Sequence, residues 1–310
     1  MRICKIQQQE TTLEEVMTDF INYKTAQQPA ARTMRDYKSY LSDFLQSSHN
    51  SIDEKTLNSD ILAYFSSIPL TSPARFNHPY QYLSSFFNWA VAQDIIRKNP
   101  IVSQGLKKKR DDGNIKPASI DDVKVLLNSF DKTIYTGLRN YVITLVLLDT
   151  GIRTSEIVQL KNSDYDAAAK QITISKTIAK TRKNRVAFLS PSTAAALNNF
   201  IKIKPTSGWE DWLFPSREGI QLTSHNMTKE FNKQCKKAGV KFTPYQLRHT
   251  FATYFVQGGG DIFTLQDLMG HSDIRMTRRY TEIDDSQKRK QHAIFSPVNE
   301  LSGRARLVSI

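Results

Sequence analysis

The chain has 310 residues, of which 39% are hydrophobic and 24% are charged, values that fit a globular protein and exclude a fibrous or low-complexity one. Its length favours two domains, each long enough to bury a core. The formal net charge of +13 indicates a polyanionic partner, and the excess lies in residues 106–310, which hold 33 cations and 20 carboxylates, whereas residues 1–105 hold ten of each.

The first domain, residues 1–105, is predicted to be a small helical bundle. Apolar side chains recur at helical spacing from Leu13 onward, and Thr12 with Glu15 provides a capping box for that helix. The four predicted helices cover residues 13–21, 37–45, 59–66 and 81–95. Four helices joined by short loops form a bundle of this kind.

A hydrophilic stretch at residues 106–116 is predicted to be an interdomain linker, because it has too few apolar side chains to pack. Ser119 with Asp122 then resembles a capping box at the start of a second domain, residues 117–285. An apolar run at 138–148 predicts a buried helix that ends before Gly151.

The rest of the second domain is predicted to combine a small antiparallel sheet with further helices. Two short runs, 171–175 and 185–189, have the composition of strands, and the stretch between them is polar and basic. They predict a hairpin with a long basic loop. Four more helices are predicted at 192–202, 224–238, 245–257 and 262–269.

Several common types of site are excluded by the sequence. It contains no GxxxxGK[ST] loop, and the glycines at 258–260 follow no strand, so no nucleotide cofactor is expected. The six histidines and two cysteines, Cys4 and Cys235, lack metal-ligand spacing, so no metal and no disulfide framework are expected. The longest nearly apolar run, 141–148, is too short for a membrane span, and the N-terminus turns polar early. We therefore expect a cytoplasmic protein without a membrane partner.

Four segments with unusual side-chain combinations follow one another in the second domain. They are Asp149-Thr150-Gly151-Ile152-Arg153-Thr154-Ser155-Glu156, the basic loop Lys180-Thr181-Arg182-Lys183-Asn184-Arg185, Thr243-Pro244-Tyr245-Gln246-Leu247-Arg248-His249-Thr250-Phe251-Ala252-Thr253, and Leu268-Met269-Gly270-His271 followed by Tyr280. In this order and spacing they resemble the boxes of the tyrosine recombinases, the phage integrase family, across residues 117–282. The N-terminal bundle is similar, more weakly, to the core-binding domain of that family.

The resemblance implies a fold that is mainly α with a small antiparallel β-sheet. A SAM-like helical core-binding domain would clamp DNA, and an α+β catalytic domain would carry the chemistry. The implied activity is that of a site-specific DNA recombinase, which breaks and rejoins strands through a 3′-phosphotyrosyl intermediate. Integration, excision or resolution of a mobile element or replicon is the implied setting.

The resemblance also implies roles for individual residues. Arg153 and Arg248 would clamp the scissile phosphate, because guanidinium groups donate paired hydrogen bonds to its oxygens. Tyr280 would be the nucleophile, and covalent catalysis of this kind needs no nucleotide cofactor. His271 would contact the phosphate or handle a proton, and Lys180 would be the general acid for the departing 5′-oxygen.

One position departs from the family pattern. Tyr245 stands where the family usually has histidine, and a phenol donates a hydrogen bond but stays neutral at pH 7. His249, next to Arg248, is weighed as a substitute and is not assigned a catalytic role. Lys176 and Lys183 are the alternatives to Lys180 as general acid. The predicted contacts to the DNA backbone are Lys107, Lys108, Lys109, Arg110, Lys176, Arg182, Lys183 and Arg185, although the first four also fit a solvated tether.

The implied partner is a double-stranded DNA recombination site, bound by a homotetramer on two sites that forms from free monomers. The tail, residues 286–310, is basic and then apolar, and in the family such a tail docks on a neighbouring protomer; packing in cis is the alternative. Two other functions remain open from the sequence. They are a catalytically inactive, sequence-specific DNA-binding protein and a type IB-like topoisomerase.

Overall fold

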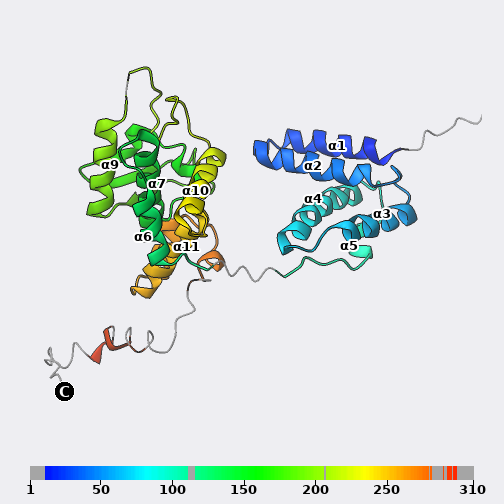
Figure 1. Ribbon diagram of the computed structural model, residues 1–310. Helices are drawn as coiled ribbons and strands as arrows, with labels where there is room; N and C mark the ends of the chain where they lie inside the picture. Colours follow the sequence, from blue (N-terminus) through cyan, green and yellow to red (C-terminus); the bar gives the residue numbers. More distant parts are fainter. Residues whose placement is uncertain are drawn as a thin grey trace, which may run out of the picture. The chain divides into compact units, whose positions relative to one another are not determined.

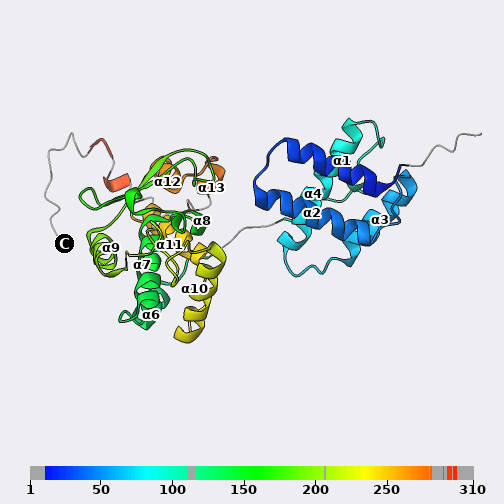
Figure 2. The same ribbon diagram turned by 90° about the horizontal axis from the view of Figure 1, so that it is seen from above.

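The computed structural model describes residues 11–110, 116–205, 207–278 and 280, with 289, 292–294 and 296–298 in the C-terminal segment. The chain divides into two compact units, Met1–Gly113 and Asn114–Ile310, each with its own hydrophobic core. Figures 1 and 2 show both units, which are described separately below. Within the described residues, no helix has the length and apolar character that spanning a membrane requires.

The N-terminal unit is a helical bundle with five helices among its described residues, one more than predicted. The capping box forms as expected: Thr12 Oγ1 accepts from the Glu15 backbone at 3.3 Å, and the Glu15 carboxylate accepts from the Thr12 backbone at 2.9 Å. Phenylalanine rings from three helices meet in its core. The helices are α1 (Leu13–Ala26), α2 (Ala31–Gln46), α3 (Glu54–Ser67), α4 (Pro73–Ala92) and α5 (Pro100–Ser103).

The α4 helix differs most from its prediction, because it begins at Pro73 rather than at residue 81. Pro73 occupies the first turn, where a missing backbone N–H costs little. Pro79 lies inside the helix and its ring is buried, so packing offsets the hydrogen bond that proline removes. The helix ends at Ala92, earlier than predicted, and Asp94 has a left-handed φ of 55°.

The first part of the predicted linker is attached to α4. Asn77 Nδ2 donates to the Lys109 carbonyl at 2.9 Å, and Asn77 Oδ1 accepts from the Lys109 backbone N–H at 2.8 Å. The Tyr80 hydroxyl donates to the Leu106 carbonyl at 3.3 Å. The backbone of this stretch is therefore fixed to α4 at Leu106 and Lys109, while residues 107–110 stay exposed. The stretch 111–115 lies outside the described residues.

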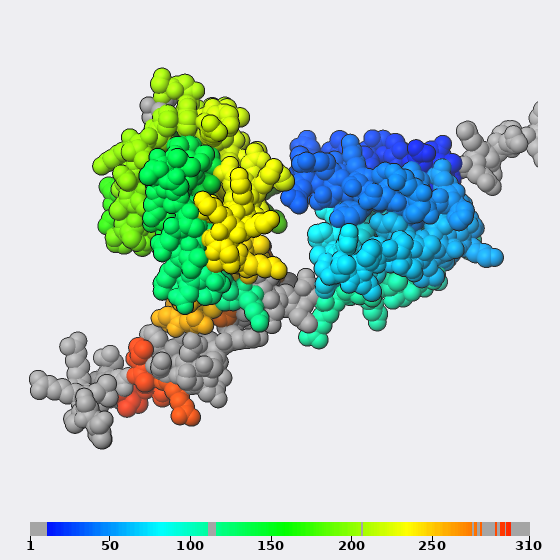
Figure 3. Space-filling view, in the orientation of Figure 1, coloured from blue at the N-terminus to red at the C-terminus, as the bar shows by residue number. Residues whose placement is uncertain are grey.

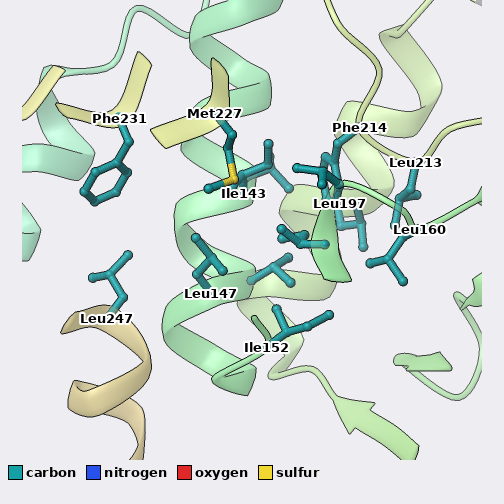
Figure 4. Close-up of a cluster of buried hydrophobic side chains, with 14 of the residues drawn as sticks. Ile143, Leu147, Ile152, Leu160, Leu197, Leu213, Phe214, Met227, Phe231 and Leu247 are labelled. Carbon is teal, nitrogen blue, oxygen red and sulfur yellow. The ribbon is translucent and has the colours of Figure 1, made fainter. Parts of the chain in front are cut away.

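The C-terminal unit surrounds one long buried helix, α7 (Tyr135–Thr150), as the apolar run predicted. α9 and α10 flank α7 in Figures 1 and 2, and α10 lies at the surface on the face shown in Figure 3. Figure 4 shows side chains from α7, α10 and α11 converging on this core. The other helices are α6 (Ile120–Ser129), α8 (Thr154–Ile157), η1 (Asn162–Asp164), α9 (Pro191–Ile203), α10 (Ser224–Ala238), α11 (Pro244–Gln257), α12 (Ile262–Met269) and α13 (Arg275–Arg278).

A small sheet of three antiparallel strands, in the order β1-β2-β3, packs on this unit. The predicted hairpin is β2 (Gln171–Ile174) with β3 (Arg185–Phe188), and β1 (Tyr165–Asp166) was not predicted because two residues carry no pattern. The mainly α fold with a small antiparallel sheet is confirmed. One local prediction is wrong: Ser119 precedes α6, but its side chain makes no capping hydrogen bond.

Candidate active site

Arg248 lies on α11, is only 4% exposed, and donates hydrogen bonds to carbonyl groups at the C-termini of two other helices. Its Nη1 donates to the Gly151 carbonyl, and its Nη2 donates to the Met269 carbonyl at 2.8 Å. Gly151 caps α7 in the left-handed conformation, with φ 61°, and Met269 is the last residue of α12. Carbonyl groups at helix C-termini carry partial negative charge, so they stabilise a cation that burial has removed from water.

Arg153 lies beside Arg248 and shares one of its acceptors. It immediately precedes α8, and its Nη1 donates to the Met269 carbonyl at 3.3 Å while its Nη2 donates to the Gly270 carbonyl at 3.0 Å. The same Nη1 donates to Glu156 Oε1 at 3.1 Å. The loop after α7 and the end of α12 therefore bring together two arginines that are far apart in the sequence.

Glu156 is the carboxylate that balances part of this charge. It is fully buried, accepts from the Arg153 backbone at 3.1 Å, and pairs with both Nη atoms of Arg185. Burial raises the pKa of the Glu156 carboxyl, but the hydrogen bond and charge of Arg185, then those of Arg153, outweigh it and hold this pKa below its usual value. Among the described residues, Glu156 thus pairs with two guanidinium groups, those of Arg153 and Arg185, while Arg248 lies beside Arg153.

Arg185 begins β3, where the sequence predicted a strand, but its side chain is buried in the site. Its side chain is 7% exposed, its Nη atoms pair with Glu156, and its Nε donates to the Leu268 carbonyl at 3.2 Å. Gly270 makes this arrangement possible: its φ is 61°, and a Cβ there would lie 3.0 Å from Arg185 Cδ. The predicted contact of Arg185 with the DNA backbone stays a prediction.

Burial and a neighbouring charge both act on the guanidinium of Arg248. Burial lowers the pKa of its guanidinium and the neighbouring Arg153 charge lowers it further, to about 9, while Glu156 and Tyr280 act in the opposite direction. Guanidinium groups keep their proton in proteins. Arg248 therefore keeps a positive charge in a site that combines burial with a second guanidinium group.

His271 connects Arg248 to the short helix α13. His271 Nε2 lies 2.8 Å from Arg248 Nη2, and His271 Nδ1 lies 2.8 Å from Thr277 Oγ1. A guanidinium can only donate, so Nε2 accepts. The hydrogen-bond network thus assigns a proton to Nδ1, which donates to the buried Thr277 hydroxyl.

Tyr280 packs on the side of α11 that is next to this network. It lies against a small apolar cluster formed by α11 and α12, and its ring centroid is 5.3 Å from that of His249. Its backbone N–H donates to the Thr277 carbonyl at 3.0 Å. The buried members of that cluster are Ala252, Val256, Leu265 and Met269.

A cavity of about 650 Å³ brings together four of the six residues predicted to be catalytic. Those four are Arg153, Lys180, Tyr245 and Arg248. Tyr245 is 46% exposed, so its phenol is accessible from the cavity. His271 and Tyr280 do not line the cavity. His271 is hydrogen-bonded to Arg248, which does line it, and the ring of Tyr280 contacts the ring of His249.

Lys180 lies on the loop between β2 and β3, on the cavity wall. Asn184 Oδ1 accepts from the Lys176 backbone N–H at 2.7 Å and so closes this loop. The side chains of Lys180 and of the other predicted phosphate contacts on the loop, Lys176, Arg182 and Lys183, are exposed.

Comparison with known proteins decides the family. Residues 119–287, more than half of the chain, match the family model described as the phage integrase family. The chain belongs to the phage integrase family. The tyrosine recombinase XerD of Listeria innocua serovar 6a is 27% identical over 92% of this chain and 99% of that protein. The tyrosine recombinase XerC of Caldanaerobacter subterraneus subsp. tengcongensis is 33% identical over 77% of this chain and 68% of that protein.

Solved structures of integrases share the fold. The Tn1549 transposon integrase in complex with transposon right end DNA has a TM-score of 0.76 at 23% identity, covering 91% of this chain and 99% of the other. A lambda integrase tetramer bound to a Holliday junction has a TM-score of 0.72 at 18% identity, covering 88% and 79%. The resemblance found in the sequence and the predicted enzyme class, a tyrosine-type site-specific DNA recombinase, are confirmed.

The sequence did not predict a functional role for two residues of the recombinase site, Glu156 and Thr277. Glu156 stands three residues after Arg153, a spacing typical of a capping box, and this local signal identifies it. Thr277 carries no such signal, because its contact with His271 depends on the packing of α13 against α12.

Proposed function

We propose that this recombinase breaks and rejoins DNA by transesterification, with Tyr280 as the nucleophile. The Tyr280 phenol oxygen would bond to phosphorus as the bond from phosphorus to the 5′-oxygen breaks, leaving a 3′-phosphotyrosyl enzyme and a free 5′-hydroxyl. The reverse attack by a 5′-hydroxyl would rejoin a strand. Each step exchanges one phosphoester for another, so neither ATP nor another energy source is required.

The observation that carries this proposal is the buried cluster of positive charge at the cavity wall. Arg153 and Arg248 both line the cavity, and their common acceptor, the Met269 carbonyl, fixes their spacing. Negative charge grows on the non-bridging oxygens as the attacking bond forms, and donors held in place for that charge lower the barrier. The lowered pKa of Arg248 supports this assignment, because an oxyanion would offset the repulsion between the guanidinium groups.

The other predicted residues take supporting roles in the proposed reaction. Lys180 lines the same cavity and would give a proton to the departing 5′-oxygen. His271, whose Nε2 contacts Arg248, would orient that guanidinium and join it at the phosphate. Tyr245 would donate a hydrogen bond to a phosphate oxygen without adding charge.

Double-stranded DNA is the proposed partner, and four copies acting on two sites are the proposed assembly. The similar solved integrases bound to transposon right end DNA and, as a tetramer, to a Holliday junction support both proposals.

The N-terminal unit would act as a DNA clamp, and residues 117–285 as the catalytic domain. The proposed backbone contacts are Lys107, Lys108, Lys109, Arg110, Lys176, Arg182, Lys183 and Arg185. We propose integration, excision or resolution of a mobile element or replicon as the setting; the proposed docking of the tail, 286–310, concerns mostly residues outside those described.

A trapping experiment tests the chemistry and finds the DNA site together. The protein is incubated with a pool of random-sequence duplexes that carry a nick, so that the short strand released by cleavage diffuses away and religation fails. Protein–DNA adducts that survive denaturation are recovered and their DNA is sequenced. We expect adducts enriched in one sequence, and none from Tyr280→Phe. Absence of adducts from the wild-type protein, or their persistence in Tyr280→Phe, would refute the proposal.

The position of Tyr245 allows a second comparison with the same trapped substrate. Tyr245→Phe removes one neutral hydrogen bond, whereas Arg248→Ala removes a buried charge with three partners. We expect Tyr245→Phe to slow adduct formation much less than Arg248→Ala. Equal losses would show that the phenol hydroxyl is essential to the reaction.

A further inference from the structure

Three rings form a continuous row that leads from the cavity to Tyr280. The Tyr245 and His249 centroids are 4.6 Å apart with the rings at 79°, and the His249 and Tyr280 centroids are 5.3 Å apart with the rings at 56°. The middle ring, His249, is 2% exposed, whereas Tyr245 lines the cavity. Centroid distances of this size at inclined angles are those of favourable aromatic contacts.

The row exists because of spacing along α11. Tyr245 and His249 are four residues apart, so their rings meet on one helical face. His249, Ala252 and Val256 follow the spacing i, i+3 and i+7, and Tyr280 packs along this same stripe. Arg248, the neighbour of His249 in the sequence, is on the part of the helix that faces the cavity.

One rigid helix therefore carries contacts to both reacting groups of the proposed cleavage. Arg248 would fix the phosphate, and His249 touches the ring of the proposed nucleophile. Nucleophilic attack requires the reacting atoms to approach within about 3 to 3.5 Å, and an error of about 1 Å can reduce the rate by about 100-fold. The relative placement of these two side chains on α11 consequently matters for the rate.

The backbone of Tyr280 is fixed separately from its ring. The chain from Arg248 through His271 to Thr277 consists of two contacts of 2.8 Å, and Thr277 accepts the backbone N–H of Tyr280. These bonds locate the Tyr280 backbone. The ring is placed by its packing, because it lies against the apolar cluster of α11 and α12 and contacts the ring of His249.

We propose that His249 is a positioning residue for Tyr280: its imidazole ring supports the tyrosine ring, braced on the other side by Tyr245. This inference rests on the proposed role of Tyr280 as nucleophile. The support acts through the shape of the ring, so phenylalanine at position 249 replaces histidine and alanine does not. His249 touches neither phosphate nor leaving group in this role.

The test compares His249→Ala, His249→Phe and the wild-type protein in single-turnover adduct formation on the trapped duplex. We expect His249→Ala to slow adduct formation by about 10- to 100-fold with an unchanged Kd for DNA, and His249→Phe to stay within about 3-fold of wild type. Tyr254→Ala, which removes an exposed ring of the same helix outside the row, is the matched control and should match wild type. A wild-type rate in His249→Ala, or equal losses in the alanine and phenylalanine variants, would overturn the proposal.

A second measurement separates support of Tyr280 from a general loss of structure. In a Tyr280→Phe background, hydrogen peroxide is supplied as an external nucleophile: its oxygen bonds to phosphorus, the 5′-oxygen leaves and gains a proton, and the peroxide proton passes to solvent. Adding His249→Ala to this background should leave the peroxide-dependent cleavage rate unchanged, whereas adding Arg248→Ala should abolish cleavage. Equal slowing of peroxide cleavage and adduct formation by His249→Ala would show that His249 acts on the phosphate pocket and would overturn the proposal.

These outcomes are distinct from failure of the proposed function. If Tyr280 is not the nucleophile, the wild-type protein forms no adduct or Tyr280→Phe still forms one. If only the role of His249 is wrong, the adduct forms through Tyr280 and does not depend on the ring at position 249. A double-mutant cycle between positions 245 and 249 completes the design, because contacting rings that act together should give non-additive losses.

Discussion

Glu156→Gln is the perturbation that most directly tests how the positive charge of the site is held. The substitution keeps the size of the side chain but removes the charge that faces Arg153 and Arg185. Glu156 is fully buried and Arg185 nearly so, and thus water cannot replace the lost charge. The amide also offers only one acceptor oxygen, so donors of the two guanidinium groups lose partners.

The expected cost follows from the burial of the pair. Removing one partner of a buried ion pair costs about 3 to 5 kcal/mol, because the other charge remains buried without compensation. For a unit of this size each kcal/mol lowers Tm by roughly 2 to 4 °C, so we expect a fall of about 6 to 20 °C. Asp121→Asn is the control, because its carboxylate pairs with Lys124 at 3.2 Å on the exposed surface. An exposed pair of that kind contributes less than about 1 kcal/mol.

Thermal unfolding at several pH values, with and without DNA, checks this prediction. The pKa of Glu156 is lowered in the folded protein, so its stabilisation is present above the ordinary value of 4.5 and is lost as pH falls below it. The wild-type and Glu156→Gln proteins should therefore converge in stability as the solution is acidified from neutral pH. Bound DNA should narrow their difference at pH 7, because a phosphate supplies negative charge to the same arginines. A Tm for Glu156→Gln no lower than that of Asp121→Asn would refute the reasoning.

Three further predictions concern contacts that hold the site and the linker. Gly270→Ala should lower the stability of the protein and slow adduct formation more than Gly259→Ala does. Both glycines have a positive φ, but only a Cβ at position 270 would lie 3.0 Å from a neighbouring arginine side chain. Thermal unfolding and the trapping assay measure the two effects. Thr277→Val should slow adduct formation by about 10-fold, and Thr277→Ser should preserve it, because only the hydroxyl accepts the His271 Nδ1 proton; equal rates would contradict that role. Asn77→Ala should speed trypsin cleavage within residues 106–110, because two hydrogen bonds to the Lys109 backbone are lost. Mass spectrometry of the folded protein during digestion measures the cleavage rate.

How much of the site the sequence predicted depends on the range of the contacts involved. The order of the boxes identified the family and four side chains that the cavity brings together, because motif residues carry their chemistry within a short segment. In the sequence, Glu156 is marked only by its position three residues after Arg153. Its ion pair with Arg185 joins two elements whose packing against each other cannot be predicted from hydrophobic periodicity. The same reasoning applies to Arg185: the sequence placed it at the start of a strand beside a basic loop, but its buried pairing with Glu156 depends on tertiary packing.

The helices show the same division between local and tertiary information. α1 begins at the predicted residue because its capping box is a property of four consecutive residues. α4 is longer than predicted because tertiary packing buries Pro79 inside it, and that packing overrides the local preference. The attachment of residues 106–110 to α4 could not be predicted either, since it depends on the side chains of Asn77 and Tyr80 and not on the composition of the linker.

The cations behind the net charge of +13 are of two physically different kinds, exposed and buried. The exposed loop cations can rearrange in solvent, so their interaction with a polyanion is weak, additive and sensitive to salt. The guanidinium groups of Arg153, Arg185 and Arg248 are held in place: carbonyl groups at the end of α12 accept hydrogen bonds from all three, and Glu156 pairs with two of them. A bound anion would offset the repulsion among these groups, and it would do so most for the species with the greatest negative charge. For a reacting phosphodiester that species is the transition state, so the repulsion that costs stability in the free protein would favour the proposed chemistry.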